Sequence, residues 1–131
     1  MKRDMDLIRK ILFKIEEEFP AGQLLLHCIN IEGYDMETVA DHCQLMYESG
    51  LINDYRPTRG GKGASVLFYS IGNLTNEGYD LLDKIREDTI WNNTKTTITE
   101  KGLPLVIDVI KDVSSTIISS MVEGVIKGVK P

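Results

Sequence analysis

The stretch ESGLIND at residues 48–54 decides the expected fold, together with NLTNEGYDLLDKI at 73–85. In the first stretch, Gly50 follows a helical pattern and can adopt the left-handed conformation that ends many helices. The two apolar residues after it return the chain to the core. In the second stretch, Thr75 can cap the start of another helix. The two motifs therefore frame the end of one helix, an intervening hairpin and the start of the next helix.

The residues between the two motifs are expected to form an antiparallel hairpin. The apolar segments 51–55 and 66–71 flank the sequence RPTRGGKGAS at 56–65, whose glycines and proline are typical of a turn. The tip carries three cations, Arg56, Arg59 and Lys62. A glycine-rich, basic tip can lie along a phosphate backbone, so these three side chains are the candidate DNA contacts. The same composition is also typical of a solvated hairpin tip.

The remaining elements follow from hydrophobic periodicity and from polar stretches. Apolar residues recur at helical spacing in four segments, 4–19, 36–49, 76–92 and 104–129. The short apolar run QLLLHCINI at 23–31 favours a buried strand. The sequence NNTKTTITEKG at 92–102 is polar and poor in helix formers, which favours a linker. We therefore expect a first domain at 1–93, a polar linker at 94–103 and an oligomerisation helix at 104–131.

Composition and charge limit the classes of function. The chain has 131 residues and a formal net charge of −5, and the charge is concentrated in residues 1–93, which carry ten Lys/Arg against sixteen Asp/Glu. A basic footprint over the whole molecule, which is usual for nucleic-acid binding, is therefore absent. The sequence contains no uncharged apolar run of about 18 residues and no signal-peptide pattern, so we expect a cytoplasmic protein without a membrane span.

Neither a metal site nor an active site is expected. Cys28 and Cys43 each follow a histidine, but adjacent side chains diverge on a strand or helix, so four such ligands do not converge on one ion. Two reduced cysteines are the simpler interpretation. The carboxylates at 16–18 lie at a helix end, and the serines between 114 and 120 lack a glycine-framed nucleophile turn. We expect no enzyme and no cofactor.

The helix expected at 36–49 is acidic where it should be exposed. It contains no Lys or Arg. Its carboxylates are Glu37, Asp41 and Glu48, and Asp35 directly precedes the helix. Carboxylates repel phosphates, so His42 and Gln44 are the only candidate base readers on this helix. The alternative is an acidic face that is solvated or binds a protein.

The segment 104–129 predicts self-association. Its apolar residues form one wide stripe opposite its polar residues, and Gly124 and Gly128 place small residues four apart, which lets helices approach closely. A soluble monomer rarely exposes such a stripe. The contact residues expected in a homo-oligomer are Ile110, Val113, Ile117, Met121, Gly124, Val125 and Gly128. The alternative is a helix that folds back onto its own domain.

The order of elements, with ESGLI before the hairpin and LTNEG after it, resembles the winged-helix superfamily of bacterial regulators. The hairpin would then be the wing. In one respect the chain departs from this pattern, because residues 23–35, QLLLHCINIEGYD, replace the separate helix that usually precedes the recognition helix. The usual mode of DNA docking is therefore not implied.

A narrower resemblance covers roughly residues 1–95. The segments KRDMDLIRKIL, ADHCQLMYESGLI, LTNEGYDLLDKIRED and TIWNNTK resemble a domain-of-unknown-function family carried by phages, prophages and other mobile elements of Gram-positive bacteria. This resemblance implies no particular activity. With the helix expected from periodicity at 104–129, the winged-helix resemblance leads us to expect an α+β winged helix with an added C-terminal amphipathic helix. The first hypothesis is a regulator that binds double-stranded DNA as an oligomer through its wing. The alternative is an interaction module that uses the helix at 36–49 against a host or phage protein.

Overall fold

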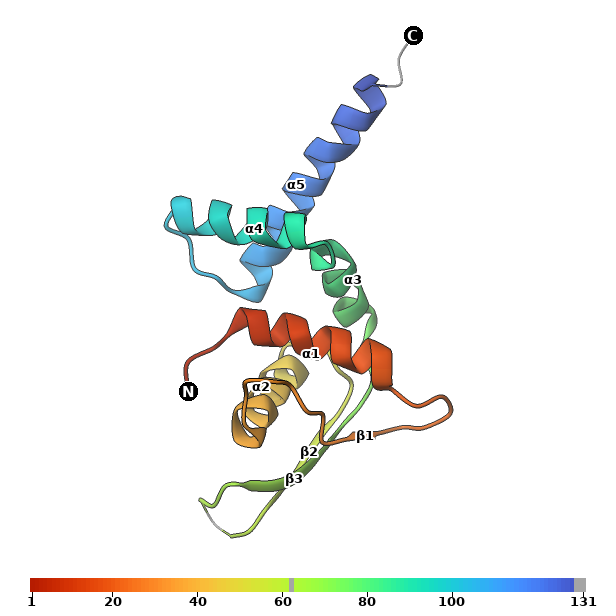
Figure 1. Ribbon diagram of the computed structural model, residues 1–131, viewed down its shortest axis with the longest axis vertical. Coiled ribbons are helices and arrows are strands. Elements are labelled where there is room, and N and C mark those ends of the chain that lie inside the picture. The colour runs from red at the N-terminus through yellow and green to blue at the C-terminus, as the bar shows by residue number, and fades with distance from the viewer. Residues whose placement is uncertain (62, 129–131) are drawn as a thin grey trace. The chain divides into compact units, whose positions relative to one another are not determined.

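The computed structural model describes residues 1–61 and 63–128 of the chain (Figure 1). These residues form an α+β fold with five helices and a small three-stranded antiparallel sheet. The described residues divide into two compact units, Met1–Asp80 and a second unit that begins at Leu81. The α+β class is as predicted.

Two capped helices, which pack on each other, build the first unit. In α1, Met5–Glu18, the Asp4 carboxylate accepts from the Leu7 N–H at 3.0 Å. In α2, Met36–Glu48, Asp35 accepts from the Thr38 N–H at 2.8 Å. These side chains satisfy N–H groups that have no partner inside the helix. The core side of α1 consists of Leu7, Ile8, Ile11, Leu12 and Ile15. The helices predicted at 4–19 and 36–49 are confirmed.

The sheet joins a hairpin to a very short strand. Strands β2, Tyr55–Arg59, and β3, Val66–Ile71, form the predicted antiparallel hairpin, and β1, Leu26–His27, pairs with the other edge of β3. The strand predicted over 23–31 is therefore wrong except at two residues. Cys28 has a φ of 29°, which is incompatible with continued strand geometry.

The two motifs that frame the hairpin touch each other. Gly50 has a φ of 77° after α2, and its carbonyl accepts a hydrogen bond from the Thr75 hydroxyl at 2.5 Å. The same hydroxyl oxygen accepts from the Gly78 N–H at 3.1 Å, which caps α3, Asn76–Ile85. A Cβ at Gly78 would overlap the carbonyl oxygen of Leu51. The end of α2 and the start of α3 are thus fixed together by backbone contacts.

The second unit corrects the expected linker. Helix α4, Asp88–Glu100, covers most of the segment predicted to be irregular, and the helix predicted at 76–92 is interrupted between α3 and α4. The side chains of Trp91, Thr94 and Ile98 are buried. Burial of this face outweighs the modest helix propensity of the threonines. The irregular connection is confined to the residues between α4 and α5.

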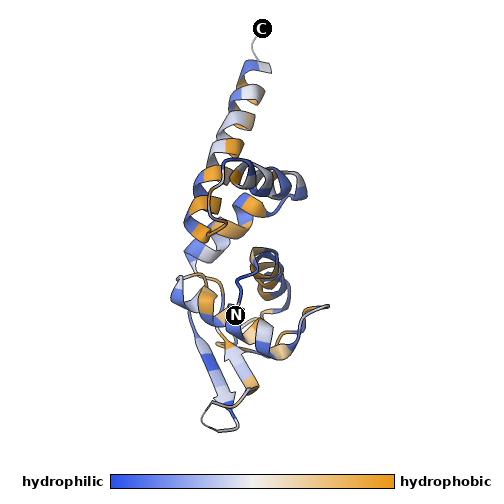
Figure 2. Ribbon diagram, turned by 90° about the vertical axis from the view of Figure 1, so that its left-hand side faces the viewer, coloured by the Kyte–Doolittle hydropathy of each residue, from blue (hydrophilic) through white to orange (hydrophobic). Residues whose placement is uncertain are grey.

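Helix α5, Ile107–Gly128, packs against α4. Hydrophobic residues recur along α5 (Figure 2), but Ile110 and Ser114 are the buried residues on it, among those the structure describes. Across the described part of the chain, no helix is long and apolar enough to cross a membrane.

Candidate functional site

An open groove of about 360 Å³ lies between α2 and β2 and is called the α2–β2 groove below. Its lining residues are Gln44, Tyr47 and Glu48 from α2, and Tyr55, Pro57 and Arg59 from β2. Residues three and four positions apart share one face of a helix, and alternate residues share one face of a strand. The spacing of the six residues therefore follows from the two elements that carry them. Among the lining residues, Tyr47 is large and hydrophobic, and it is 46% exposed.

A carboxylate of α2 connects the helix to the hairpin. Glu37 Oε2 accepts from the backbone N–H of Val66 at 2.6 Å, and its Oε1 lies 3.4 Å from Nη1 of Arg59. Arg59 also donates to the carbonyl oxygen of Ala64 at 2.9 Å. The candidate DNA contact Arg59 is therefore already engaged with an anion and a carbonyl of its own chain.

The other predicted hairpin contacts have different positions. Arg56 Nε lies 2.7 Å from Oδ2 of Asp54, and its side chain is 67% exposed. Lys62 lies outside the described residues. Both described hairpin arginines thus have a carboxylate as neighbour, which lowers the positive potential available to a phosphate.

His42 is fully buried, so the prediction that it reads bases is wrong. Its Nε2 accepts from the backbone N–H of Asp4 at 2.9 Å, and Nδ1 lies 2.8 Å from the Thr38 carbonyl oxygen. A backbone N–H only donates and a carbonyl only accepts, so the ring must be neutral with its proton on Nδ1. Its position three residues after buried Val39 was the sequence signal for the core. Gln44 is exposed and donates to Glu48 at 3.0 Å.

Beneath the groove, Tyr55 buries a polar atom without a partner. Its Oη makes no hydrogen bond to any described residue. Burial, with the nearby Cys43 thiol, raises the pKa of Tyr55 to about 12. The neighbouring Tyr69, whose ring centroid is 6.5 Å away, donates instead to the carbonyl oxygen of Ile29 at 2.9 Å. Burial also raises the pKa of Cys43 to about 12, so this thiol stays protonated near neutral pH.

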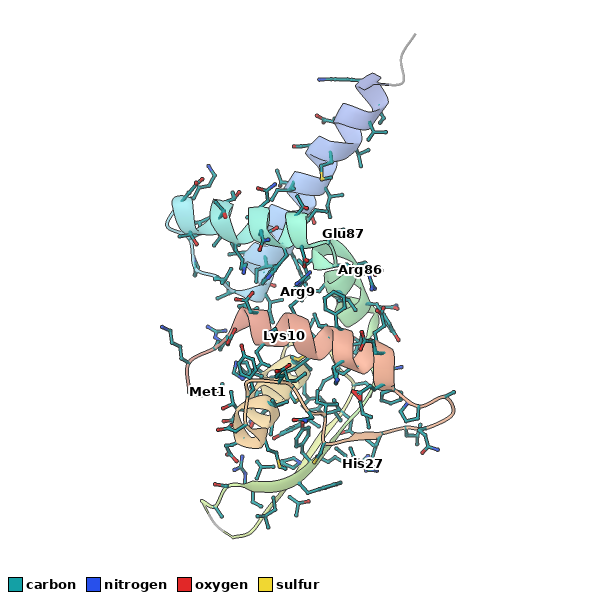
Figure 3. All side chains as sticks on the ribbon, viewed as in Figure 1. Met1, Arg9, Lys10, His27, Arg86 and Glu87 are labelled. Atoms are coloured by element: carbon teal, nitrogen blue, oxygen red, sulfur yellow. The ribbon has the colours of Figure 1, made fainter. Side chains whose placement is uncertain are left out.

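The histidines and cysteines are separately engaged. His27 Nδ1 lies 2.7 Å from the Ser70 hydroxyl oxygen, and its ring lies 5.4 Å from that of Phe68. Figure 3 shows His27 on the side of the sheet away from α1. The Cys28 thiol donates to the carbonyl oxygen of Tyr69 at 3.4 Å. The described residues contain no group of three or more His, Cys, Asp or Glu side chains that could hold a metal ion.

The predicted oligomerisation residues divide along α5. Ile110 is buried within the chain itself, so the prediction that it contacts a second copy is wrong. Val113 and Ile117 are half-buried and line a pocket of about 250 Å³ with Thr97 of α4 and Lys101, which directly follows α4. This packing against α4 was not predicted, because α4 was expected to be a linker. The remaining predicted contacts are exposed, namely Met121, Gly124, Val125 and Gly128.

Sequence reasoning missed the aromatic side of the groove. Tyr47, Tyr55 and Pro57 were not candidate site residues, although they line the same groove as Gln44 and Arg59. The local signal was the exposed helical face that Gln44, Tyr47 and Glu48 share. Pairing this face with alternate residues of β2 depends on a tertiary contact that neither segment specifies alone.

Comparison with known proteins gives a family and one relative. Residues 2–104 match the family described as Hypothetical protein (DUF2513). An uncharacterized protein of Haemophilus influenzae is 46% identical over 123 residues, which are 92% of this chain and 98% of that protein. No solved structure matches the chain.

Proposed function

Since the chain belongs to the family described as Hypothetical protein (DUF2513), a description that states no activity, we propose a function from the geometry of its own residues. The protein is a non-catalytic module that binds a partner protein through the α2–β2 groove. One observation carries the proposal: the groove combines aromatic surface from Tyr47 and Tyr55 with the carboxylate of Glu48. Aromatic residues are enriched at protein interfaces, where they anchor the buried centre.

The charge of α2 supports a protein rather than a nucleic acid as the partner. Asp41 and Glu48 form no ion pair within the described residues, and α2 contains no Lys or Arg. A phosphate backbone near this face would meet repulsion instead of releasing counterions. With His42 buried, Gln44 is the remaining candidate base reader on α2.

The proposed architecture of this module is a winged helix. The order α1, β1, α2, β2, β3, α3 supports it, and so do the contacts of Gly50 with Thr75 and of Leu51 with Gly78. The β2–β3 hairpin is then the wing. By the resemblance of its motifs, the module is a cytoplasmic regulatory protein of phage or mobile-element type.

The second unit is proposed to join copies of the chain. Four large apolar side chains are more than half exposed near the end of α5, namely Met121, Val122, Val125 and Ile126. A Cβ at Gly124 or Gly128 would meet no atom within 4 Å, so a second helix can approach their backbone closely. A homo-oligomer centred on this half of α5 would cover the exposed apolar surface.

Double-stranded DNA, bound by the β2–β3 hairpin, is the second candidate ligand. The exposure of Arg56 favours it, because an exposed ion pair contributes at most about 1 kcal/mol and a phosphate could replace Asp54. We expect this binding to be weak, with Kd about 10⁻⁴ M or weaker at physiological salt. Fluorescence anisotropy with labelled duplex DNA measures it. Micromolar binding that Arg56→Ala with Arg59→Ala abolishes would favour DNA over the protein partner.

Quantitative affinity purification of the full chain from its native cells tests the first candidate. The variant Tyr47→Ala with Glu48→Lys removes the ring and reverses the charge at the groove. Tyr79→Ala removes another exposed tyrosine, which lies on α3. We expect a protein that co-purifies with the wild type and the Tyr79 control but not with the groove variant. Identical co-purified proteins from both variants would contradict the proposal.

A further inference from the structure

We propose that the α2–β2 groove binds an extended, proline-containing basic segment of the partner protein. This inference rests on the proposed function and specifies the chemistry of its ligand. The ligand's prolines lie against Tyr47, Tyr55 and Pro57, and a Lys or Arg side chain lies against Glu48.

The shape and lining of the groove favour an extended segment. Two tyrosines and a proline contribute to its lining, and the groove is open to solvent. Grooves lined by aromatic rings bind polyproline II segments, whose rigid conformation reduces the entropy lost on binding. Such a segment has three residues per turn, so prolines on one side can leave a charged side chain free to face the helix.

The charge around the groove selects a basic ligand. Arg59, the cation that lines the groove, is already paired with Glu37 and donates to the carbonyl oxygen of Ala64. Among the described residues, the carboxylate of Glu48 accepts a hydrogen bond only from the neutral side-chain amide of Gln44. A ligand cation beside Glu48 would also lie next to the exposed ring of Tyr47, which adds a cation–π attraction.

A different mode of peptide binding is disfavoured by the sheet. The strand order β1-β3-β2 makes β2 an edge, which could in principle accept an added strand. Pro57 lies at the centre of β2 and has no N–H to donate, and proline on an edge strand discourages such pairing. The ligand is therefore held by its side chains in the groove rather than by a backbone ladder.

Fluorescence anisotropy with three labelled synthetic peptides tests the proposal on the full chain. The probe contains three repeats of Pro-Pro-Arg, and the two controls contain three repeats of Pro-Pro-Glu and of Gly-Ser-Arg. We expect the probe to bind at least about tenfold more tightly than either control. Binding of the Gly-Ser-Arg peptide as tightly as the probe would mean that charge alone is recognised, and this would overturn the proposal.

Matched variants then place the probe on the protein. Tyr47→Ala and Glu48→Lys should each weaken binding at least about tenfold, whereas Tyr47→Phe, which keeps the ring, should leave it unchanged. Tyr79→Ala and Glu17→Lys change the same two residue types at exposed positions outside the groove and should have no effect. Circular dichroism establishes that each variant is folded. If the probe fails to bind while the groove variant still loses its co-purified protein, the proposed function stands and this ligand class is wrong.

Discussion

The backbone N–H of Asp4 donates a hydrogen bond to Nε2 of His42 at 2.9 Å, which attaches the cap of α1 directly to α2. The carboxylate of Asp4 also accepts from the hydroxyl of Tyr34 at 2.9 Å, and this bond raises the pKa of Tyr34. The buried, neutral imidazole of His42 therefore holds the start of α1. Tyr34, in the loop before α2, is bonded to the same cap residue, Asp4.

His42→Ala should destabilise the fold rather than affect any ligand. The change leaves the partly buried N–H of Asp4 without its acceptor, and loss of a partner for such a donor costs about 1–3 kcal/mol. Urea unfolding of the variant should show a loss of this size. Gln44→Ala, an exposed change on the same helix, should stay within about 0.5 kcal/mol of the wild type. Equal effects of the two changes would contradict the buried position of His42.

Gly78→Ala should be strongly destabilising although it improves helix propensity. The added Cβ would overlap the carbonyl oxygen of Leu51, so the end of α2 or the start of α3 must move. We expect a loss of at least about 2 kcal/mol in the free energy of unfolding. Ser119→Ala is the control, because Ser119 is exposed on α5 and alanine is a better helix former than serine. Stabilisation by both changes would refute the contact.

Tyr55→Phe should leave stability unchanged or raise it. The hydroxyl of Tyr55 has no partner in the described residues, so its removal ends the cost of burying an unpaired polar group. Tyr69→Phe removes the bond to Ile29 and should cost about 0.5–1.5 kcal/mol. Thermal unfolding of the two variants compares them directly. A loss at Tyr55 as large as that at Tyr69 would show that this hydroxyl is paired.

Val125→Asp should separate the proposed oligomer into monomers. The side chain of Val125 is 69% exposed in the single chain, so an aspartate there does not disturb the folded unit but places an unpaired charge in a helix–helix contact. Ser119→Asp, at an exposed polar position of α5, is the control. Sedimentation velocity should find the wild type and control associated and Val125→Asp monomeric. A monomeric wild type at high micromolar concentration would exclude association through α5.

The sequence predicted the parts of the fold that depend on local signals. Caps such as Asp4 and Asp35, and the turn at Gly50, identified α1 and α2, and glycine content identified the hairpin. Helix α4 was missed because its threonines are weak helix formers and burial of Trp91 supplies the stability that propensity lacks.

The candidate site was less predictable because it depends on pairs that are distant in sequence. His42 was assigned by residue type, although its helical position placed it in the core. The pairing of Arg59 with Glu37 joins residues 22 positions apart. Nothing in either local sequence indicates that Arg59 of the hairpin is paired with a carboxylate of α2.

Site-specific photo-crosslinking tests the central claim most directly, because it reports which molecule lies against the groove. The photoreactive residue p-benzoylphenylalanine replaces Tyr47, or Tyr79 as the control, in the full chain expressed in its native cells. We predict a covalent adduct with a protein from position 47 and none from position 79. Glu48→Lys in the same chain should lower the yield at least about tenfold. Equal yields from the two positions, or a yield that Glu48→Lys leaves unchanged, would contradict the assignment of the α2–β2 groove as a protein-binding site.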